Sequence, residues 1–129
     1  MLIEIQLHPK KGRIVIARND IAQGELIEAA PVAPFPPIDR SIINNTCLFE
    51  YYFVKPDEYI KSREVKGYFV FGFASICSHA VIPNAYVEWM ESETGSWAHL
   101  IALRNIRAGE EVTLYYTNID EYDSAQEFV

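Results

Sequence analysis

Cysteines and long apolar runs are scarce in this sequence. The two cysteines, Cys47 and Cys77, are too few for a disulfide framework or a four-cysteine zinc site. Because both have apolar neighbours, we expect buried, reduced thiols. No apolar run approaches the ~18 residues that a membrane helix needs. The first residues carry an acid and a glutamine within a short apolar stretch, so no secretory signal is expected. These absences predict a soluble, intracellular protein without a membrane partner.

Positive charge is also in short supply. The 11 Lys and Arg residues are outnumbered by 18 Asp and Glu residues, which gives a formal net charge of -7. This is the wrong sign for general binding to a phosphate backbone, so no direct nucleic-acid partner is expected. The acidic balance favours a cationic partner or substrate instead.

The composition is that of one globular domain. The chain has 129 residues, of which 50% are hydrophobic and 22% charged. A chain of this length buries about two-thirds of the surface that it exposes when unfolded, so it holds a core without covalent links. We therefore expect a single domain over residues 1–129.

Short strands are the dominant local pattern. Segments with β-branched or alternating apolar residues predict strands. They cover residues 2–7, 13–17, 25–28, 47–54, 67–73, 85–90, 97–103 and 112–116. Four prolines within residues 31–37 predict an irregular surface excursion over 31–45, because a central strand does not tolerate proline. Residues 56–66 are turn-like, with room for a short helix. The prediction is a mostly β chain.

One seven-residue pattern occurs twice. Residues 21–27 and 106–112 share Ile-x-x-Gly-Glu-x-apolar, and each follows the end of an Ala-containing strand. The pattern predicts a tight turn between two strands, with glycine where a positive φ is needed. Two ordinary β-turns would also explain it.

Common catalytic and metal constellations are poorly matched. The pair Cys77 and His79, with His99 added, does not have the spacing that zinc prefers, so no metal site is expected. Nothing marks either cysteine as an activated nucleophile, and there is no glycine-rich phosphate loop. The acidic pairs at residues 110–111 and 120–121 are expected to be solvated surface.

Tyrosine is abundant and clustered. Eight tyrosines include the neighbours Tyr51 and Tyr52, Tyr115 and Tyr116, and the later Tyr122. Tyrosines can line a narrow slot for an ammonium group through cation–π attraction and hydroxyl hydrogen bonds. Packing in the core is the alternative for any single one of them.

Several segments follow one another in a definite order and spacing. They are residues 11–17 (KGRIVIA) with 21–27, residues 50–53 (EYYF), residues 71–85 (FGFASICSHAVIPNA), and residues 101–106 with 109–116 (GEEVTLYY). Together, over residues 11–122, they resemble the SET domain of protein-lysine methyltransferases, in particular its smallest, SET-only members. The order and spacing carry the resemblance, since each segment alone is a weak signal.

The resemblance implies a fold, a cofactor and a substrate. The fold would be a β-clip-like arrangement of several small sheets, with a knot-like crossing in which the C-terminal segment passes beneath a loop. The cofactor would be S-adenosylmethionine, and the acceptor would be the ε-amine of a lysine in a basic protein or peptide. A homodimer is an open possibility by analogy.

The resemblance also assigns roles to residues of this chain. Tyr116 would stand at the methyl-transfer centre, and Tyr51 and Tyr122 would line the lysine channel. The expected cofactor-binding residues are Gly12, Arg13, Ile14, Ser78 and His79.

Three positions depart from the family pattern. Ile14 replaces a glycine, Ser78 replaces an asparagine, and Ala80 replaces a serine. Serine cannot offer the donor and acceptor pair of an amide, and an unpaired buried polar group costs about 1–3 kcal/mol. Weak or absent cofactor binding is therefore one expectation. The alternative to a methyltransferase is a catalytically impaired SET-like module that binds a basic peptide or a partner protein.

Overall fold

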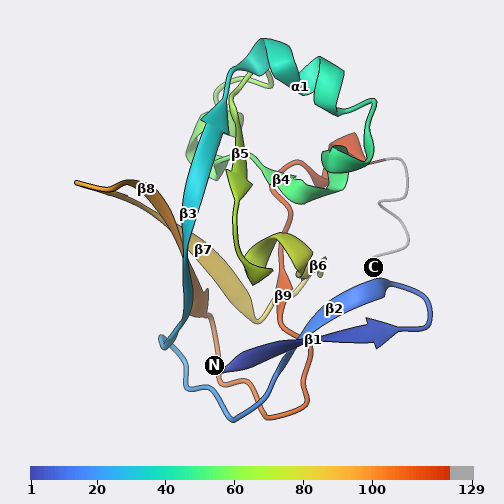
Figure 1. The fold of residues 1–129 in the computed structure, drawn as a ribbon, viewed down its shortest axis with the longest axis vertical. Coiled ribbons are helices and arrows are strands. Elements are labelled where there is room, and N and C mark those ends of the chain that lie inside the picture. Colours follow the sequence, from blue (N-terminus) through green and yellow to red (C-terminus); the bar gives the residue numbers. More distant parts are fainter. Residues whose placement is uncertain (123–129) are drawn as a thin grey trace.

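Strands make up most of the regular structure, as the sequence predicts. The computed structural model of the protein describes residues 1–122 (Figure 1). Within that part of the chain the strands are β1 (Ile3–His8), β2 (Gly12–Ala17), β3 (Leu26–Phe35), β4 (Tyr52–Phe53), β5 (Gly67–Val70), β6 (Ser78–His79), β7 (Ala85–Ser92), β8 (Gly95–Ala102) and β9 (Thr113–Leu114). The helices are α1 (Pro37–Ile43) and α2 (Pro56–Tyr59), with the 3₁₀ helices η1 (Cys47–Tyr51), η2 (Phe73–Ile76) and η3 (Ile119–Glu121).

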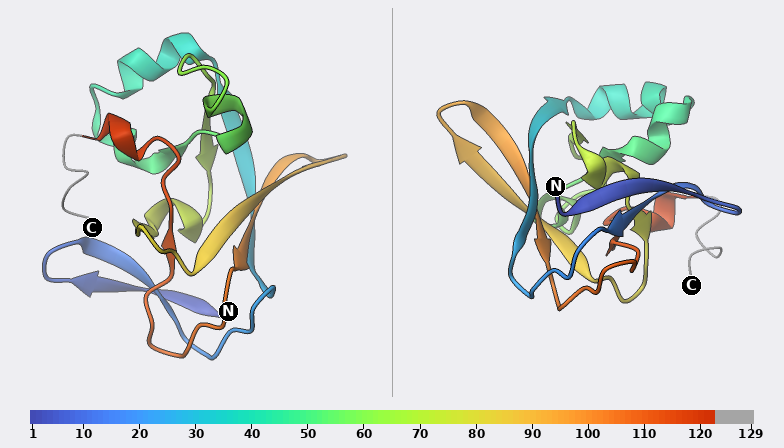
Figure 2. Two further views of the ribbon diagram at one scale, coloured as in Figure 1. Left: turned by 180° about the vertical axis from the view of Figure 1, so that it is seen from behind. Right: turned by 60° about the horizontal axis from the view of Figure 1, so that its bottom comes forward.

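The strands form several small sheets. The hairpin of β1 and β2 is one sheet, and β6 and β9 form a second, parallel one. The third has the order β4-β5-β3-β8-β7. In Figure 2 the hairpins β1–β2 and β7–β8 extend from the body of the molecule, and α1 covers one end. The mostly β fold of several small sheets is confirmed, whereas the knot-like threading of the C-terminal segment stays a prediction.

Strand β3 runs through the proline-rich stretch, so the prediction of an irregular segment from residue 31 onward is wrong. Pro31 pairs with Trp97 of β8, and Pro34 pairs with Tyr68 of β5. Strand β3 pairs with β8 up to residue 31 and with β5 from residue 32. Pro31 and Pro34 thus lie where β3 changes partner, and each has a registered strand partner on one side only, although the carbonyl of Pro31 also accepts from the N–H of Phe71 at 3.0 Å.

Two further segments differ from the sequence prediction. Pro37 begins α1, where its missing N–H has no intrahelical partner to lose and its fixed φ suits the first turn. Residues 47–51 form η1 instead of a strand, and only β4 continues as extended chain. Cys47 is exposed there, contrary to expectation, while Cys77 is fully buried; both thiols are free.

The repeated pattern folds into two mutually paired turns, which we call the turn clasp (residues 17–25 and 102–110). Ile21 and Ile106 exchange both backbone hydrogen bonds, at 2.7 and 2.8 Å. The N–H of Gly24 donates to the carbonyl of Ala102, and that of Gly109 donates to the carbonyl of Ala17, each at 2.8 Å.

The side chains of the clasp follow the same symmetry. Glu25 and Glu110 each accept from a backbone N–H three residues earlier, both at 3.0 Å. Asp20 and Asn105 each accept from the opposite turn, at 2.9 and 2.8 Å. The predicted positive φ is confirmed at Gly24 (83°) and Gly109 (91°). The repeat is thus a pseudo-twofold unit and not two unrelated turns.

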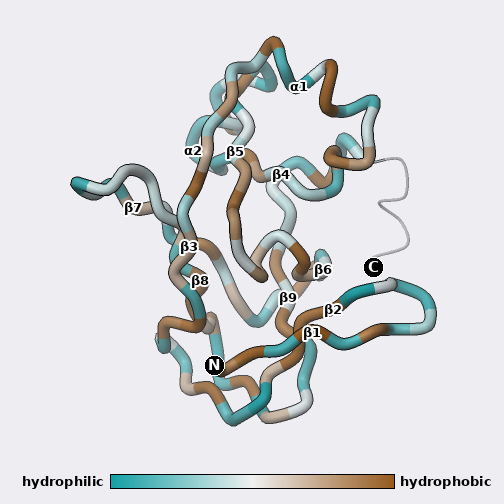
Figure 3. Tube along the Cα trace, viewed as in Figure 1, coloured by the Kyte–Doolittle hydropathy of each residue, from teal (hydrophilic) through white to brown (hydrophobic). Residues whose placement is uncertain are grey.

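The main core lies between the hairpins and the clasp. Its fully buried side chains include Ile3, Val15, Ile21, Leu100, Ile106, Val112 and Cys77. A smaller cluster beneath α1 and α2 contains Phe35, Tyr52, Val54, Tyr59 and Val65. Figure 3 shows hydrophobic colour concentrated where the elements meet and hydrophilic colour at the hairpin tips. Among residues 1–122, no helix has the length and apolar character that crossing a membrane requires.

Candidate active site

Residues 78–79 and residues 113–114, far apart in the sequence, lie side by side. Strand β6 pairs in parallel with β9, and Asn84 fastens the join from a position that is 2% exposed. Its amide donates to the carbonyl of Glu111 and accepts from the N–H of Thr113, both at 2.8 Å. The hydrogen bonds of Asn84, which follows Pro83, therefore help to hold residues 78–79 beside residues 113–116.

Helix η2 is held at its start by a carboxylate from β3. The two oxygens of Glu28 accept from the N–H groups of Phe73 and Ala74, at 2.8 and 3.2 Å. A Cβ at Gly72 would lie 2.5 Å from a Glu28 oxygen, so glycine is required for this approach. The contact places Ser75 at the site. The sequence analysis missed Glu28, because only its pairing in the fold brings it to residue 73.

His79 orients Tyr116. The imidazole Nδ1 accepts from the backbone N–H of Tyr116 at 2.9 Å, so the proton of the neutral ring is on Nε2. Burial lowers the pKa of His79, which keeps the ring neutral. The ring also lies edge-on to Tyr115, with centroids 4.8 Å apart. His79 thus acts on the position of the tyrosine pair.

Tyr116 is fixed at both its backbone and its hydroxyl. Its phenol donates to the carbonyl of Cys77 at 2.5 Å. Its ring faces Tyr122 with centroids 5.5 Å apart, and Tyr122 packs in turn on Phe49 at 4.6 Å. Burial raises the pKa of both tyrosines, with a further contribution from the charge of Glu50. Both phenols are therefore protonated at neutral pH.

Two cavities meet at this tyrosine pair. The larger has a volume of about 680 Å³ and the smaller about 340 Å³. The larger is lined by His8, Lys10, Lys11, Gly12, Arg13, Glu50, Tyr51, Ser75, Ile76, Ser78, Tyr116 and Tyr122. The smaller is lined largely by apolar and aromatic side chains from β4, from β7 and from residues 114–122, among them Phe53, Val87, Trp89, Leu103 and Tyr115. Both share Glu50, Ser75, Tyr116 and Tyr122, so these four residues form the junction between them.

Most of the residues predicted for the site come together there. Gly12, Arg13 and Ser78, predicted for the cofactor, line the larger cavity. Tyr116 and Tyr122 lie at the junction, whereas Tyr51 lines the larger cavity only.

Two of the predicted cofactor residues do not line the larger cavity. The side chain of Ile14 is buried within β2. His79 is 5% exposed and accepts the hydrogen bond from the backbone N–H of Tyr116. The β-branched side chain at position 14 therefore does not fill the larger cavity.

Glu50 is a junction residue that the sequence analysis did not assign. It belongs to the EYYF segment, and the only available signal was its place beside Tyr51. Of the residues that line the smaller cavity, it alone carries a formal charge at neutral pH. A carboxylate at the junction attracts a cation entering from that side.

The larger cavity suits a small polar ligand with a carboxylate. Its volume falls in the usual range of ligand pockets, about 300–1,000 Å³. Lys10, Lys11 and Arg13 lie along one wall, although Lys11 also pairs with Glu111 at 2.8 Å. Among residues 1–122, no group of three His, Cys, Asp or Glu side chains is placed to hold a metal ion.

Comparison with known proteins gives one consistent result. The family model described as the SET domain matches residues 12–117. A candidate histone methyltransferase of Plasmodium falciparum has a similar structure, with a TM-score of 0.64 and 23% identity over 88% of this chain and 91% of that one. A chain from apo ctPRC2 with two mutations in Ezh2 matches with a TM-score of 0.68 and 16% identity, over 97% of this chain and 16% of that one. No curated protein matches the sequence.

Proposed function

The chain belongs to the SET-domain family, and on that premise we propose that it is an S-adenosylmethionine-dependent protein-lysine N-methyltransferase. The observation that carries the proposal is the meeting of two cavities at Tyr116 and Tyr122. A methyl donor and a lysine can approach each other there from opposite sides. The alignment of an in-line displacement requires such an arrangement.

The larger cavity is the proposed cofactor side. Gly12 and Arg13 would offer backbone and a cation, and Ser78 would offer a hydroxyl. When bound, S-adenosylmethionine supplies an electrophilic methyl group on a sulfonium. The walls formed by Tyr51 and Tyr116 would limit access of water to that group.

The smaller cavity is the proposed lysine side. The reference pKa of a lysine amine is about 10.4, so the amine arrives charged and must lose a proton before it attacks. The apolar and aromatic lining disfavours the charged form and lowers the pKa of the amine. Glu50 would draw the ammonium group toward the junction. The amine would give its proton to solvent water before it enters the apolar part of the cavity, and it would attack in the neutral form.

The two junction tyrosines orient the amine and do not act as bases. Their raised pKa values keep both phenols neutral. The Tyr116 proton is directed to the carbonyl of Cys77, so the phenol oxygen would meet an amine as an acceptor. This role requires position and not strong basicity.

The test of this proposal combines cofactor binding with methyl transfer. S-adenosylmethionine should release or absorb measurable heat when titrated into the protein. Radiolabelled methyl transfer should be detected on core histones, chosen first because of the Plasmodium neighbour, and on a library of lysine-containing peptides. Tyr116→Phe should lower the transfer rate at least about a hundredfold, as is typical when a positioned hydroxyl is removed from a reaction centre. Absence of both heat at millimolar cofactor and labelled product would reject the proposal.

A second candidate is a SET-like module that binds a basic peptide without catalysis. The substitutions Ser78 and Ala80 favour it, because Ser78 offers one hydroxyl in place of an amide and Ala80 has no polar side chain. This module would bind lysine-rich peptides but give no heat with S-adenosylmethionine. Restoring Asn at 78 and Ser at 80 should then recover cofactor binding.

A further inference from the structure

The closing segment (residues 115–122) carries the junction tyrosines but has few backbone ties to the rest of the molecule. The backbone hydrogen bonds of residues 117–122 run within the segment, from Ile119, Glu121 and Tyr122 to carbonyls three residues earlier. Strand β9 ends before it, at Leu114. The position of Tyr122 therefore depends on side chains that hold η3 in place.

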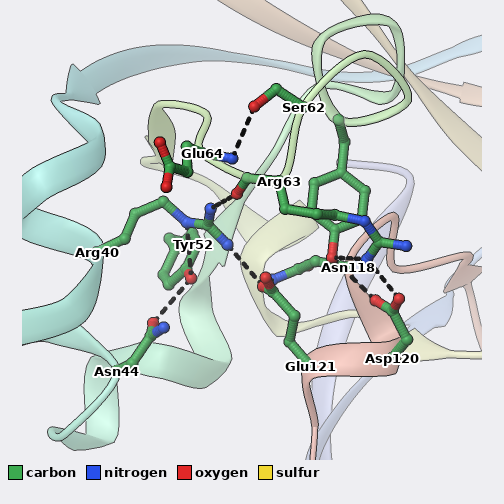
Figure 4. Close-up of polar contacts among 10 residues, drawn as sticks. Arg40, Asn44, Tyr52, Ser62, Arg63, Glu64, Asn118, Asp120 and Glu121 are labelled. Atoms are coloured by element: carbon green, nitrogen blue, oxygen red, sulfur yellow. Dashed lines mark hydrogen bonds and ion pairs between the residues drawn. The ribbon is translucent and has the colours of Figure 1, made fainter.

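Arg40 of α1 supplies the central contact. It is 6% exposed, and its guanidinium donates to Glu121 at 2.6 Å, to the carbonyl of Arg63 at 2.7 Å and to the phenol of Tyr52 at 3.2 Å. Figure 4 shows these three contacts converging on one side chain, with Asn44 completing the chain of bonds beyond Tyr52 at 2.8 Å. Arg40 thus connects α1, the loop after α2 and η3.

A second, more exposed contact holds the same short helix. Arg63 pairs with Asp120, and Asp120 also accepts from the phenol of Tyr59 at 2.9 Å. The acidic pair that the sequence analysis placed on the solvated surface is therefore divided between two arginines. Glu121 pairs with the buried arginine, Arg40. The side-chain amide of Asn118 also donates to Glu121, at 2.9 Å.

Geometry favours Arg40 over Arg63 as the residue that controls η3. The ion pair of Arg40 is largely shielded from water, whereas Arg63 and Asp120 are both more than half exposed on their side chains (64% and 52%). Exposed pairs contribute little, while a shielded guanidinium with three acceptors fixes its partner in direction as well as distance. A lysine could not serve three acceptors with the same planar geometry.

We propose that Arg40 is a positioning residue that, through Glu121, holds Tyr122 against Tyr116 and so sets the width of the lysine channel. This inference rests on the proposed methyltransferase function. It predicts that loosening the pair changes how many methyl groups a lysine receives, since a wider channel admits a bulkier, already methylated amine.

The experiment compares Arg40→Gln, Glu121→Gln and the double variant with Arg18→Gln. Arg18 is the matched control, because its side chain is exposed and forms only a surface pair with Glu4 at 3.6 Å, directly after β2. Three quantities are measured for each protein. They are the kcat and KM for peptide methylation, the ratio of mono-, di- and trimethylated product at equal conversion, and the hydrogen exchange of the amides in residues 117–122.

We expect each single variant of the pair to lower kcat about tenfold with a KM change below about threefold. The product should shift toward higher methylation, and exchange in residues 117–122 should accelerate. The effects of the two variants should not add in the double variant, because the ion pair between Arg40 and Glu121 is already lost in each single variant. Arg40→Lys should recover part of the effect, and Arg18→Gln should match the wild type.

The outcomes separate this inference from the proposed function. A product ratio does not depend on the fraction of active enzyme, so a general loss of folding would leave it unchanged. Unchanged exchange in both Arg40→Gln and Glu121→Gln would overturn the inference, as would faster exchange with an unchanged product ratio. A wild-type protein without methyl transfer would reject the function, while the exchange measurement would still decide whether Arg40 holds the segment. If Arg40→Gln does not fold, Glu121→Gln carries the same test.

Discussion

The turn clasp and the closing segment are held by different kinds of contact. In the clasp, backbone groups pair with backbone groups, and every bond on one turn has its counterpart on the other. In the closing segment, the positioning bonds to the rest of the molecule come mainly from side chains, with Arg40 and His79 as the principal partners. The frame of the molecule is thus redundant, whereas the site depends on a few individual residues.

This difference separates stability from activity. Backbone pairing depends on chain direction and turn geometry, so many side chains could be exchanged without losing it. A side-chain tie fails when its one residue is replaced. Substitutions of exposed clasp side chains should therefore be tolerated, and its buried core residues should be the most costly to replace. Substitutions around the closing segment should alter the site while the fold persists.

The largest effect is expected at the centre of the clasp. Ile21→Ala and Ile106→Ala should each lower the free energy of unfolding by about 2–5 kcal/mol, because each leaves a cavity at a position only 1% exposed. The pseudo-twofold relation predicts similar values for the two. Urea denaturation measures them, with Ile60→Ala, at an 86% exposed position, as the control that should change little. A loss at one isoleucine only would break the symmetry of the clasp.

Replacing the two arginines that bind the closing segment should lower the free energy of unfolding by less than the two isoleucine substitutions do. Arg40→Gln should cost about 2 kcal/mol, because a buried guanidinium is removed from three acceptors while the partly exposed Glu121 regains water. Arg63→Gln should cost less than Arg40→Gln, because exposed pairs contribute little. Thermal unfolding of both variants tests the ranking. Equal losses of stability in the two variants would show that both ion pairs stabilise the closing segment to the same extent.

A smaller effect is expected at the glycines of the clasp. Gly24→Ala and Gly109→Ala should each cost about 1–2 kcal/mol through the left-handed backbone alone, because a Cβ meets nothing within 4 Å at either position. Asparagine tolerates this conformation better, so Gly24→Asn should cost less than Gly24→Ala. Thermal melts give the comparison. An alanine variant as stable as the wild type would contradict the assigned strain.

The smallest effect is a pH dependence at His79. Burial holds its pKa in the folded state below the ordinary value of 6.5, so the unfolded state binds more protons as the pH falls below 6.5. The contribution is therefore fully present above that value and is lost at lower pH, when protonation breaks the bond from the Tyr116 N–H. Urea midpoints between pH 7.5 and 5.5 should fall for the wild type and fall less for His79→Asn, whose amide oxygen can still accept. Parallel pH profiles would exclude this role.

Much of the frame could be predicted from local residues. The alternating strands, the hairpin of residues 85–103 and the glycine turns follow from periodicity and from the φ that each turn needs. The proline-rich stretch could not be judged in this way. Pro31 and Pro34 fit a strand only because β3 changes partner near residue 31, and that change is a property of the sheet.

The site was predicted only in part for a related reason. The resemblance located Tyr116 and Tyr122, which meet at the junction, but it assigned Tyr51 to the lysine channel. Tyr51 lines the larger cavity only, and its neighbour Tyr52 lines the smaller one and binds Arg40. Glu28 was missed because it has no local signal, and Glu50 was missed because its only signal was its place beside Tyr51. Their roles come from neighbours far along the chain.

The sequence alone determined most of the strands, the two glycine turns and the family resemblance, since these depend on short-range patterns of apolar residues, glycines and motif order. Only the tertiary structure decided that Arg40 would meet Glu121, 81 positions away, and that the two cavities would join at a tyrosine pair. Long-range contacts of this kind arise from packing geometry, because no local rule specifies which side chains a folded chain brings within hydrogen-bond distance.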